Sequence, residues 1–170
     1  MSSALTAINP INHFAWVVDD LDAAIDLWVR VLGVGPFFVV PHVKWAELEF
    51  GGQPSTMDLS IALAWRGDAQ IELIQQHDDA PSVFNRYAGD SGGVQHVGIR
   101  TSDHAPLERR LVDGGFRCVQ RGRNAAGTET IYMHHEQVGV VEIIATKDNS
   151  FLEKMKKAAA EWDGITPRAN

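Results

Sequence analysis

The sequence repeats one order of predicted elements twice, and this repeat constrains the fold more than any other feature. In the first copy, an apolar strand at 11–18 precedes a helix whose apolar residues recur at helical spacing and which ends at Gly33. The second copy opens with a strand at 94–100 and a helix that ends at Gly114. Three more strands complete each copy, at 37–40, 57–65 and 69–75 and at 116–120, 128–133 and 138–145. The repeat predicts a mixed α+β fold made of two modules, each with the order strand, helix, strand, strand, strand.

The chain has the length of one compact unit. Its 170 residues are enough to bury roughly 70% of the surface of the unfolded chain. We expect a single domain spanning 1–170, in which the first module occupies 9–77 and the second module occupies 92–146. The polar, turn-rich stretch at 78–91 is predicted to link the modules. A C-terminal helix and tail at 148–170 have no counterpart in the first module, and we expect this helix to pack on the rest of the domain.

Composition and charge exclude several classes of protein. Hydrophobic residues make up 45% of the chain and charged residues 22%, as in ordinary globular proteins. The net charge of −7 argues against nucleic-acid binding, which needs a basic surface. No apolar run approaches the roughly 20 residues that cross a bilayer, and the first ten residues lack the features of a signal peptide. The single Cys118 is expected to be a buried, unreactive thiol. We therefore expect a cytoplasmic protein that binds neither nucleic acid nor membranes.

Four residues stand at matching places in the two copies. His13 and His96 lie in the strand that opens each copy, and Glu72 and Glu142 lie in the strand that closes it. The spacing is 72 − 13 = 59 residues in the first copy and 142 − 96 = 46 residues in the second. The residues next to them in each strand are mostly apolar, so the alternation of side chains directs all four away from the apolar faces. If helices cover the apolar faces, the four polar side chains share the uncovered, concave face.

Two imidazoles and two carboxylates on one face can form a site for a divalent metal ion. Taken singly, a histidine on a strand is more often a hydrogen-bonded core or surface residue, and a glutamate is usually solvated. The recurrence of both at equivalent positions in the two copies favours metal binding over coincidence. One ion of Zn, Co, Ni, Mn or Fe suits this set of ligands, and the sequence does not choose among them.

Several segments resemble the vicinal oxygen chelate superfamily, which includes glyoxalase I and methylmalonyl-CoA epimerase. The stretch HFAWVVDDLDAAIDLWVRVLGVGPF is similar to the opening strand and helix of that family. QIELIQQ is similar to its fourth strand, GGVQHVGIRT to the start of its second module, and YMHHEQVGVVEII to its last pair of strands. The resemblance covers about residues 11–146. The stretch DAPSVFNRYAGDSGGVQHVGIRTSD is most similar to the epimerase branch.

The resemblance implies a fold and an activity. The two βαβββ modules would form an open, barrel-like mixed sheet around one metal ion, with His13, Glu72, His96 and Glu142 as ligands. The chain would be a metal-dependent isomerase or epimerase that polarises the carbonyl of a small-molecule substrate and moves an α-proton, with a 2-substituted acyl-CoA as the leading candidate. Glu142 or Glu72 would act as the catalytic base by loosening from the metal. Related proteins form dimers, so a homodimer is one possible assembly.

Departures from the epimerase pattern keep other chemistries open. The epimerase has Gln at the position of Glu72, where bacterial glyoxalase I has Glu. Its further catalytic carboxylate, which comes from the region 41–58, has no clear match, although Glu47 and Glu49 lie there. The ligand set also fits a glyoxalase I-type lyase that acts on a thiol conjugate. An extradiol-type dioxygenase and a non-catalytic small-molecule binding protein are the remaining alternatives.

Two further groups of polar residues are candidates for the site. His134 and His135 are alternative bases, and the alternation of the strand lets only one of them face inward. Arg117, Arg121 and Arg123 form a local basic cluster that would either hold a phosphate or carboxylate of the substrate or belong to a solvated surface.

Overall fold

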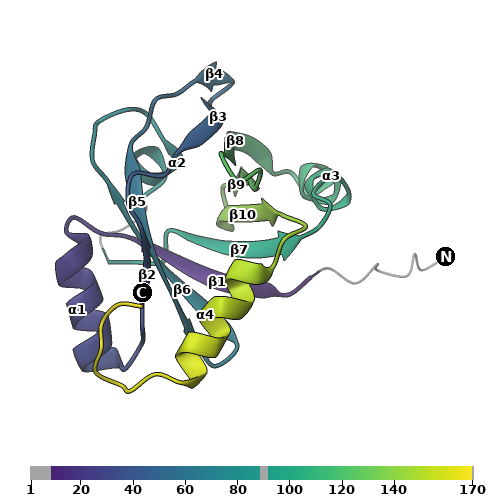
Figure 1. Cartoon of the computed structure of the whole chain (residues 1–170). Coiled ribbons are helices and arrows are strands. Elements are labelled where there is room, and N and C mark those ends of the chain that lie inside the picture. Colours follow the sequence, from purple (N-terminus) through teal and green to yellow (C-terminus); the bar gives the residue numbers. More distant parts are fainter. Residues whose placement is uncertain (1–8, 89–91, 170) are drawn as a thin grey trace.

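The computed structural model describes residues 9–88 and 92–169, and within them ten strands form one curled sheet accompanied by four helices (Figure 1). The strands are β1 (Ile11–Val17), β2 (Phe38–Val40), β3 (Trp45–Phe50), β4 (Gln53–Pro54), β5 (Leu59–Arg66), β6 (Ala69–Gln76), β7 (His96–Thr101), β8 (Arg117–Asn124), β9 (Glu129–His135) and β10 (Gly139–Ala145). The helices are α1 (Leu21–Leu32), α2 (Val83–Arg86), α3 (Ala105–Asp113) and α4 (Ser150–Ala160). The predicted α+β class, with an open, barrel-like mixed sheet and an added C-terminal helix, is confirmed.

The two halves of the sheet have the same internal order, reversed about its middle. The strands follow the order β2-β5-β6-β1-β7-β10-β9-β8-β3-β4. Within the halves, β1 runs parallel to β6 and β7 runs parallel to β10. The halves meet where β1 pairs antiparallel with β7. The strands that open and close each half are therefore neighbours at the centre of the sheet. The residue bounds of the two modules, 9–77 and 92–146, stay a prediction.

The strands β3 and β4 break the repeat and were absent from the sequence prediction. Here β3, a strand from the first half of the chain, pairs antiparallel with β8 in the second half. The insertion between β2 and β5 accounts for the longer spacing in the first copy. Sequence alternation does not reveal β3, because the register shifts between Trp45 and Glu47 and Leu48 is its one fully buried residue.

Helix α1 follows the predicted signals closely. The side chain of Asp20 caps it by accepting a hydrogen bond from the Ala23 N–H, and Gly33 ends it with φ of 62°. Its buried face packs against β6 and β5, on the side of the sheet opposite the predicted metal ligands. Helix α3 begins after His104, whose own side chain does not cap it, and the Asp103 Oδ1 atom accepts a hydrogen bond from the Ala105 N–H at 3.1 Å.

The polar linker contains the short helix α2, which the sequence analysis treated as irregular. Ser82 and Asn85 form a reciprocal capping box at its start, and Val83 and Phe84 are buried. Residues 89–91 of the linker lie outside the described part of the chain. The position of α2 matters for the site, because the backbone oxygen of Val83 accepts a hydrogen bond from the side chain of Gln95.

Helix α4 packs against β5, as expected, and also extends to the concave face (Figure 1). Met155 is 1% exposed and contacts Phe38 and Leu63. Phe151, in the first turn of α4, lines a cavity on the concave face. The C-terminal helix thus forms part of a wall of the cavity.

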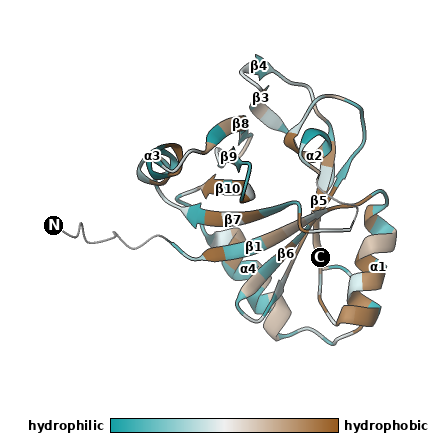
Figure 2. Cartoon of the chain, turned by 180° about the vertical axis from the view of Figure 1, so that it is seen from behind, coloured by the Kyte–Doolittle hydropathy of each residue, from teal (hydrophilic) through white to brown (hydrophobic). Residues whose placement is uncertain are grey.

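Hydrophobic residues concentrate in the central strands, as the brown ribbons of Figure 2 show. They form separate clusters on the two faces of the sheet, one beneath α1, one beneath α3 and one on the concave side. Among the described residues, no helix is both long and apolar enough to cross a membrane.

Candidate metal centre

The four repeated residues come together at the centre of the sheet. His13 lies on β1, Glu72 on β6, His96 on β7 and Glu142 on β10, and these four strands are adjacent. All four residues are buried, with exposed fractions between 0% and 8%. One ligand atom from each lies within 4.8 Å of the others. The fold thus assembles the set that the repeat singled out, while the role of these residues as metal ligands belongs to the proposal below.

The distances within this cluster suit a shared metal ion. The Nε2 atoms of His13 and His96 face each other at 3.2 Å. The Glu142 Oε2 atom lies 2.9 Å from His13 Nε2 and 3.4 Å from His96 Nε2, and Glu72 Oε2 lies at 3.6 Å and 3.7 Å. Ligand atoms bound about 2.1 Å from one ion in tetrahedral or octahedral geometry are separated by roughly 3.0–3.4 Å. The four residues therefore fit one divalent ion with only small movements of Glu72.

Gln95 fixes the orientation of the His96 ring. Its Oε1 atom lies 2.6 Å from His96 Nδ1. Because a carbonyl oxygen only accepts, Nδ1 carries a proton, and in the neutral ring Nε2 has the lone pair that faces the cluster. The amide of Gln95 is itself held by donating to the backbone oxygens of Val83 and Tyr87. This chain of contacts links α2 to the candidate site.

Gly98 makes room for His13. A Cβ atom built on Gly98 would lie 1.5 Å from Cε1 of the His13 ring, which is not a possible contact. Gly98 pairs with His13 on β1 and with Glu142 on β10, so it lies at the centre of the cluster. The absence of a side chain at this position is a condition for the geometry of the site.

Charge coupling inside the cluster is strong. Burial would raise the pKa of Glu142, but hydrogen bonds and charges from His13 and His96 together hold it well below its usual range. Burial would lower the pKa of His96, but Glu142 and Glu72 outweigh that effect and raise it to about 9. Without a metal, a second proton on His96, at Nε2, therefore supplies one positive charge between the two carboxylates.

A cavity of about 330 Å³ opens on the concave face beside the cluster. Glu72 and Glu142 belong to its lining. Most of the remaining wall is apolar and includes Trp45, Leu59 and Phe84. This volume lies in the lower part of the range of small-molecule sites. Polar residues such as Gln70, Thr130 and Tyr132 also line the cavity.

Tyr132 is a residue of the cavity that the sequence analysis missed. It lies on β9 directly opposite Glu142 on β10, and it is 4% exposed. Burial raises the pKa of its hydroxyl well above the usual value, and the negative charges of Glu142 and Glu72 raise it further. The hydroxyl therefore stays protonated and can act as a hydrogen-bond donor. Alternation from the candidate His134 would have placed Tyr132 on the same face.

The other candidate bases do not line the cavity. His134 faces the concave side and contacts the Tyr87 ring, whereas His135 packs on Phe116 on the opposite side. The alternation prediction for this pair is thus confirmed. Glu47 and Glu49 are exposed on β3, and Glu47 pairs with Arg123. Neither glutamate is part of the cavity lining.

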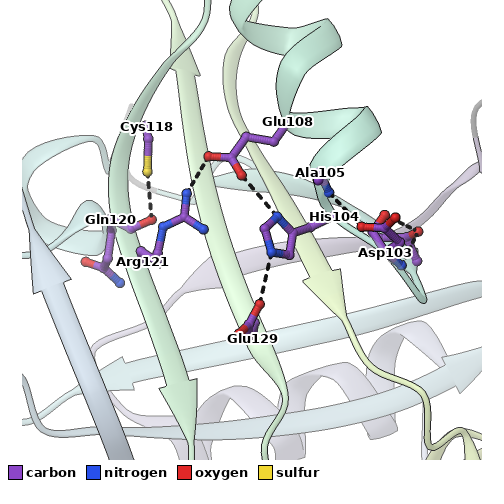
Figure 3. Close-up of polar contacts among 9 residues, drawn as sticks. Asp103, His104, Ala105, Glu108, Cys118, Gln120, Arg121 and Glu129 are labelled. Atoms are coloured by element: carbon purple, nitrogen blue, oxygen red, sulfur yellow. Dashed lines mark hydrogen bonds and ion pairs between the residues drawn. The ribbon is translucent and has the colours of Figure 1, made fainter.

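The basic cluster on β8 belongs to the surface. Arg117 pairs with Glu136, and Arg121 pairs with Glu108. Figure 3 shows that Glu108 also contacts His104, which in turn contacts Glu129. In the same view the Sγ atom of Cys118 points to the backbone oxygen of Gln120. The solvated alternative for the arginines is therefore the correct one. The expected burial of Cys118 is wrong, because the start of β8 is exposed.

Solved structures with the same fold include epimerases. A hypothetical protein from Bacillus halodurans C-125 is 16% identical, with 82% of this chain and 96% of that one covered and a TM-score of 0.59. Methylmalonyl-CoA epimerase from Mycobacterium tuberculosis is 22% identical over 88% of this chain and 96% of its own, with a TM-score of 0.58. A variant of the Streptomyces coelicolor epimerase in complex with 2-nitronate-propionyl-CoA is 17% identical over 83% and 96%, with a TM-score of 0.55. At these identities the likeness shows the fold alone.

Sequence comparison supplies the family. None of the curated proteins matches the chain. A family profile described as the glyoxalase, bleomycin resistance protein and dioxygenase superfamily matches residues 12–133. This range contains all of β6 and β7 and all but the first residue of β1, and therefore His13, Glu72 and His96. The chain belongs to the glyoxalase, bleomycin resistance protein and dioxygenase superfamily, which confirms its resemblance to the vicinal oxygen chelate proteins.

Proposed function

We propose that the chain is a metal-dependent isomerase or epimerase that moves the α-proton of a carbonyl compound, with a 2-substituted acyl-CoA as the leading substrate. The observation that carries this proposal is the buried set of two histidines and two glutamates in the wall of an apolar cavity. Epimerases among the proteins of similar fold, one of them bound to methylmalonyl-CoA, support this choice of substrate class.

In this proposal His13, Glu72, His96 and Glu142 hold one divalent ion. The two carboxylates neutralise its charge, and Gln95 keeps the Nε2 atom of His96 available. When bound, the ion would supply the Lewis acid that polarises a substrate carbonyl and stabilises the enolate. The apolar wall excludes water, which strengthens these electrostatic interactions.

Glu72 is the better candidate for the base. Its Oε2 atom is farther from both histidines than that of Glu142. Its side chain is 10% exposed, against 3% for Glu142. Glu72 can therefore turn toward a substrate in the cavity and accept the α-proton at a lower cost than Glu142. Protonated Tyr132 stands beside Glu142 and can donate a hydrogen bond to a substrate oxygen.

A glyoxalase I-type lyase is the second candidate. It is favoured by Glu72, because a carboxylate at this position matches that branch, as noted above. The same carboxylate argues against an extradiol-type dioxygenase, which leaves that position open, and the complete ligand set argues against a non-catalytic binding protein. A homodimer remains part of the proposal, and light scattering on the purified chain tests it.

Metal content is the first test. The untagged protein should contain about one divalent ion per chain by mass spectrometry, as expected for a single four-ligand site. Glu142→Ala should lose the ion, whereas Glu129→Ala, which removes an exposed carboxylate that also pairs with a histidine, should keep it. Absence of metal from the wild-type protein, even after reconstitution with Zn, Co, Ni and Mn, would contradict the proposal.

Proton exchange is the second test. The metal-loaded protein should exchange the α-proton of a 2-substituted acyl thioester in D₂O, followed by NMR. Glu72→Gln should slow exchange by roughly 100-fold or more, because the base is lost. If the protein turns over a glutathione hemithioacetal and does not exchange the thioester proton, the epimerase function is rejected in favour of the lyase function.

A further inference from the structure

Arg100 is a half-buried cation in the wall of the same cavity. On β7 it follows His96 and Gly98 at steps of two residues, so its side chain lies on the concave face with them. Two residues of strand separate it from Gly98, a rise of roughly 7 Å. Arg100 therefore stands beside the cluster of His13, Glu72, His96 and Glu142 and is not one of its members.

The guanidinium group of Arg100 has no ion pair or hydrogen bond with any residue in 9–88 or 92–169, and its Nε atom is buried without a partner. The carboxylates of Glu72 and Glu142 act on it electrostatically but are engaged by the two histidines. Burial lowers the pKa of Arg100, yet a guanidinium remains protonated at neutral pH. A half-buried charge without a partner is unfavourable unless a ligand supplies one.

The charges of the cavity leave Arg100 unbalanced. Once a divalent ion is held, its two positive charges balance Glu72 and Glu142. The only other charged residue of the lining, Asp148, is exposed at the rim, and its Oδ1 atom accepts a hydrogen bond from the Ser150 N–H. Away from the exposed Asp148, Arg100 is thus the one charge of the loaded cavity that is not compensated, and it favours a negatively charged substrate group beside it.

We propose that Arg100 binds a carboxylate of the substrate, so that the substrate is a carbonyl compound with an anionic group a short carbon chain away. This inference rests on the proposed function and narrows its substrate class. The planar guanidinium offers paired donors that match the two oxygens of a carboxylate. Arg100 acts as a specificity-determining residue, and a neutral acyl group leaves it without a partner.

The test compares two ligands of the same shape. Succinate and succinamate differ in one carboxylate, which is replaced by a neutral amide, and both are titrated into the zinc-loaded protein by calorimetry. The wild-type protein should bind succinate about 10- to 100-fold more tightly, as expected for a charge-assisted pair. Arg100→Met should abolish this preference, and Arg100→Lys should keep part of it. The surface variant Arg121→Met should behave as wild type. Equal binding of both ligands by the wild type, or an unchanged preference in Arg100→Met, overturns the proposal.

Zinc affinity separates binding from a structural role. Removing a positive charge beside the ion should leave the zinc affinity of Arg100→Met unchanged or raise it, while succinate affinity falls. Loss of zinc and succinate together would mean that Arg100 only supports the fold, and the proposal would be wrong.

Proton exchange distinguishes this inference from the proposed function. If neutral and carboxylate-bearing acyl thioesters exchange equally fast, the role of Arg100 is rejected and the proton-transfer function stands. If succinate preference depends on Arg100 but no thioester exchanges, the anion site stands and the proton-transfer function is rejected.

Discussion

Two of the histidine and glutamate clusters among residues 9–88 and 92–169 contain two glutamates each, and they differ in what surrounds them. In the buried cluster, His13 and His96 lie between Glu72 and Glu142. In the second cluster, which is partly exposed and is called the exposed cluster below, His104 contacts Glu108 at 3.0 Å and Glu129 at 3.2 Å (Figure 3). Residue types and distances are similar, so these alone do not identify a metal site.

Charge balance and burial separate the two clusters. Arg121 pairs with Glu108 and supplies the exposed cluster with a permanent cation. Among the described residues, no lysine or arginine forms an ion pair with Glu72 or Glu142, although both are buried. A cation must compensate them, and only the buried cluster therefore requires a metal ion or a proton. Five predictions test this difference.

The largest effect is expected from Gly98→Ala. The added methyl group would occupy the position of the His13 ring and push it out of the buried cluster. Zinc binding should be lost, as measured by mass spectrometry and by titration. Ile99→Ala is the matched control, because Ile99 is the next residue of β7 and faces the core beneath α3. It should lower the free energy of unfolding by about 2–5 kcal/mol and keep the metal. Full zinc binding by Gly98→Ala would contradict this account of the site.

The second effect is a pH dependence of zinc affinity. His96, with its pKa raised to about 9, is protonated at neutral pH in the metal-free protein, and zinc must displace this proton. Affinity should therefore rise about tenfold per pH unit up to that pKa, as competition with a chelator between pH 6.5 and 8.5 can measure. His104→Ala should leave the slope unchanged. A flat profile would show that His96 is already neutral.

The same proton affects the stability of the metal-free protein with a defined sign. The pKa of His96 in the folded protein is raised above its ordinary value of 6.5 to about 9. Its contribution to the free energy of unfolding is therefore complete below pH 6.5 and is lost as pH rises toward 9. The pKa of Glu142 is lowered in the folded protein, so its contribution to the free energy of unfolding is present at neutral pH and is lost only in acid. Urea unfolding of the metal-free protein should therefore show falling stability from pH 6.5 to 9, and zinc should remove this fall.

Much of this site was accessible from the sequence, because its ligands obey the repeat. His13, Glu72, His96 and Glu142 come from strands with regular alternation, and the reversed order of the two halves places these strands side by side. Alternation of single strands could not give this order, which depends on pairing between residues far apart in the chain. The family resemblance supplied the expectation of one shared centre.

Contacts made by irregular or inserted segments were not predictable in the same way. The bulge in β3 hid the strand that brings Trp45 to the cavity. No pattern in the sequence indicated a role for Gln95 or Arg100. The role of Gln95 depends on its contact with α2, and that of Arg100 depends on the absence of a nearby partner. The sequence also suggested a binding role for the arginines of β8, and only their partners in space show that they form ion pairs.

A smaller effect is expected from Gln95→Leu. This change removes the acceptor for His96 Nδ1 and two hydrogen bonds to the linker while keeping a similar side-chain volume. Loss of an outer hydrogen bond to a metal-bound histidine weakens metal affinity by about 10- to 100-fold. Chelator competition on folded protein measures this, with Gln137→Leu on the exposed β9–β10 turn as the control. Unchanged zinc affinity would mean that the His96 ring is held by packing alone.

The smallest effect is expected in the exposed cluster. His104 and Glu129 are 29% and 40% exposed in their side chains, so water competes for their contact. A double-mutant cycle of His104→Ala and Glu129→Ala should give a coupling free energy of no more than about 1 kcal/mol, and salt should reduce it. Zinc content should stay the same in all three variants, because Arg121 neutralises Glu108 and water reaches Glu129. A coupling of several kcal/mol, or a loss of zinc, would remove the distinction between the two clusters, since burial and charge balance would then no longer decide which histidine–glutamate set holds a metal.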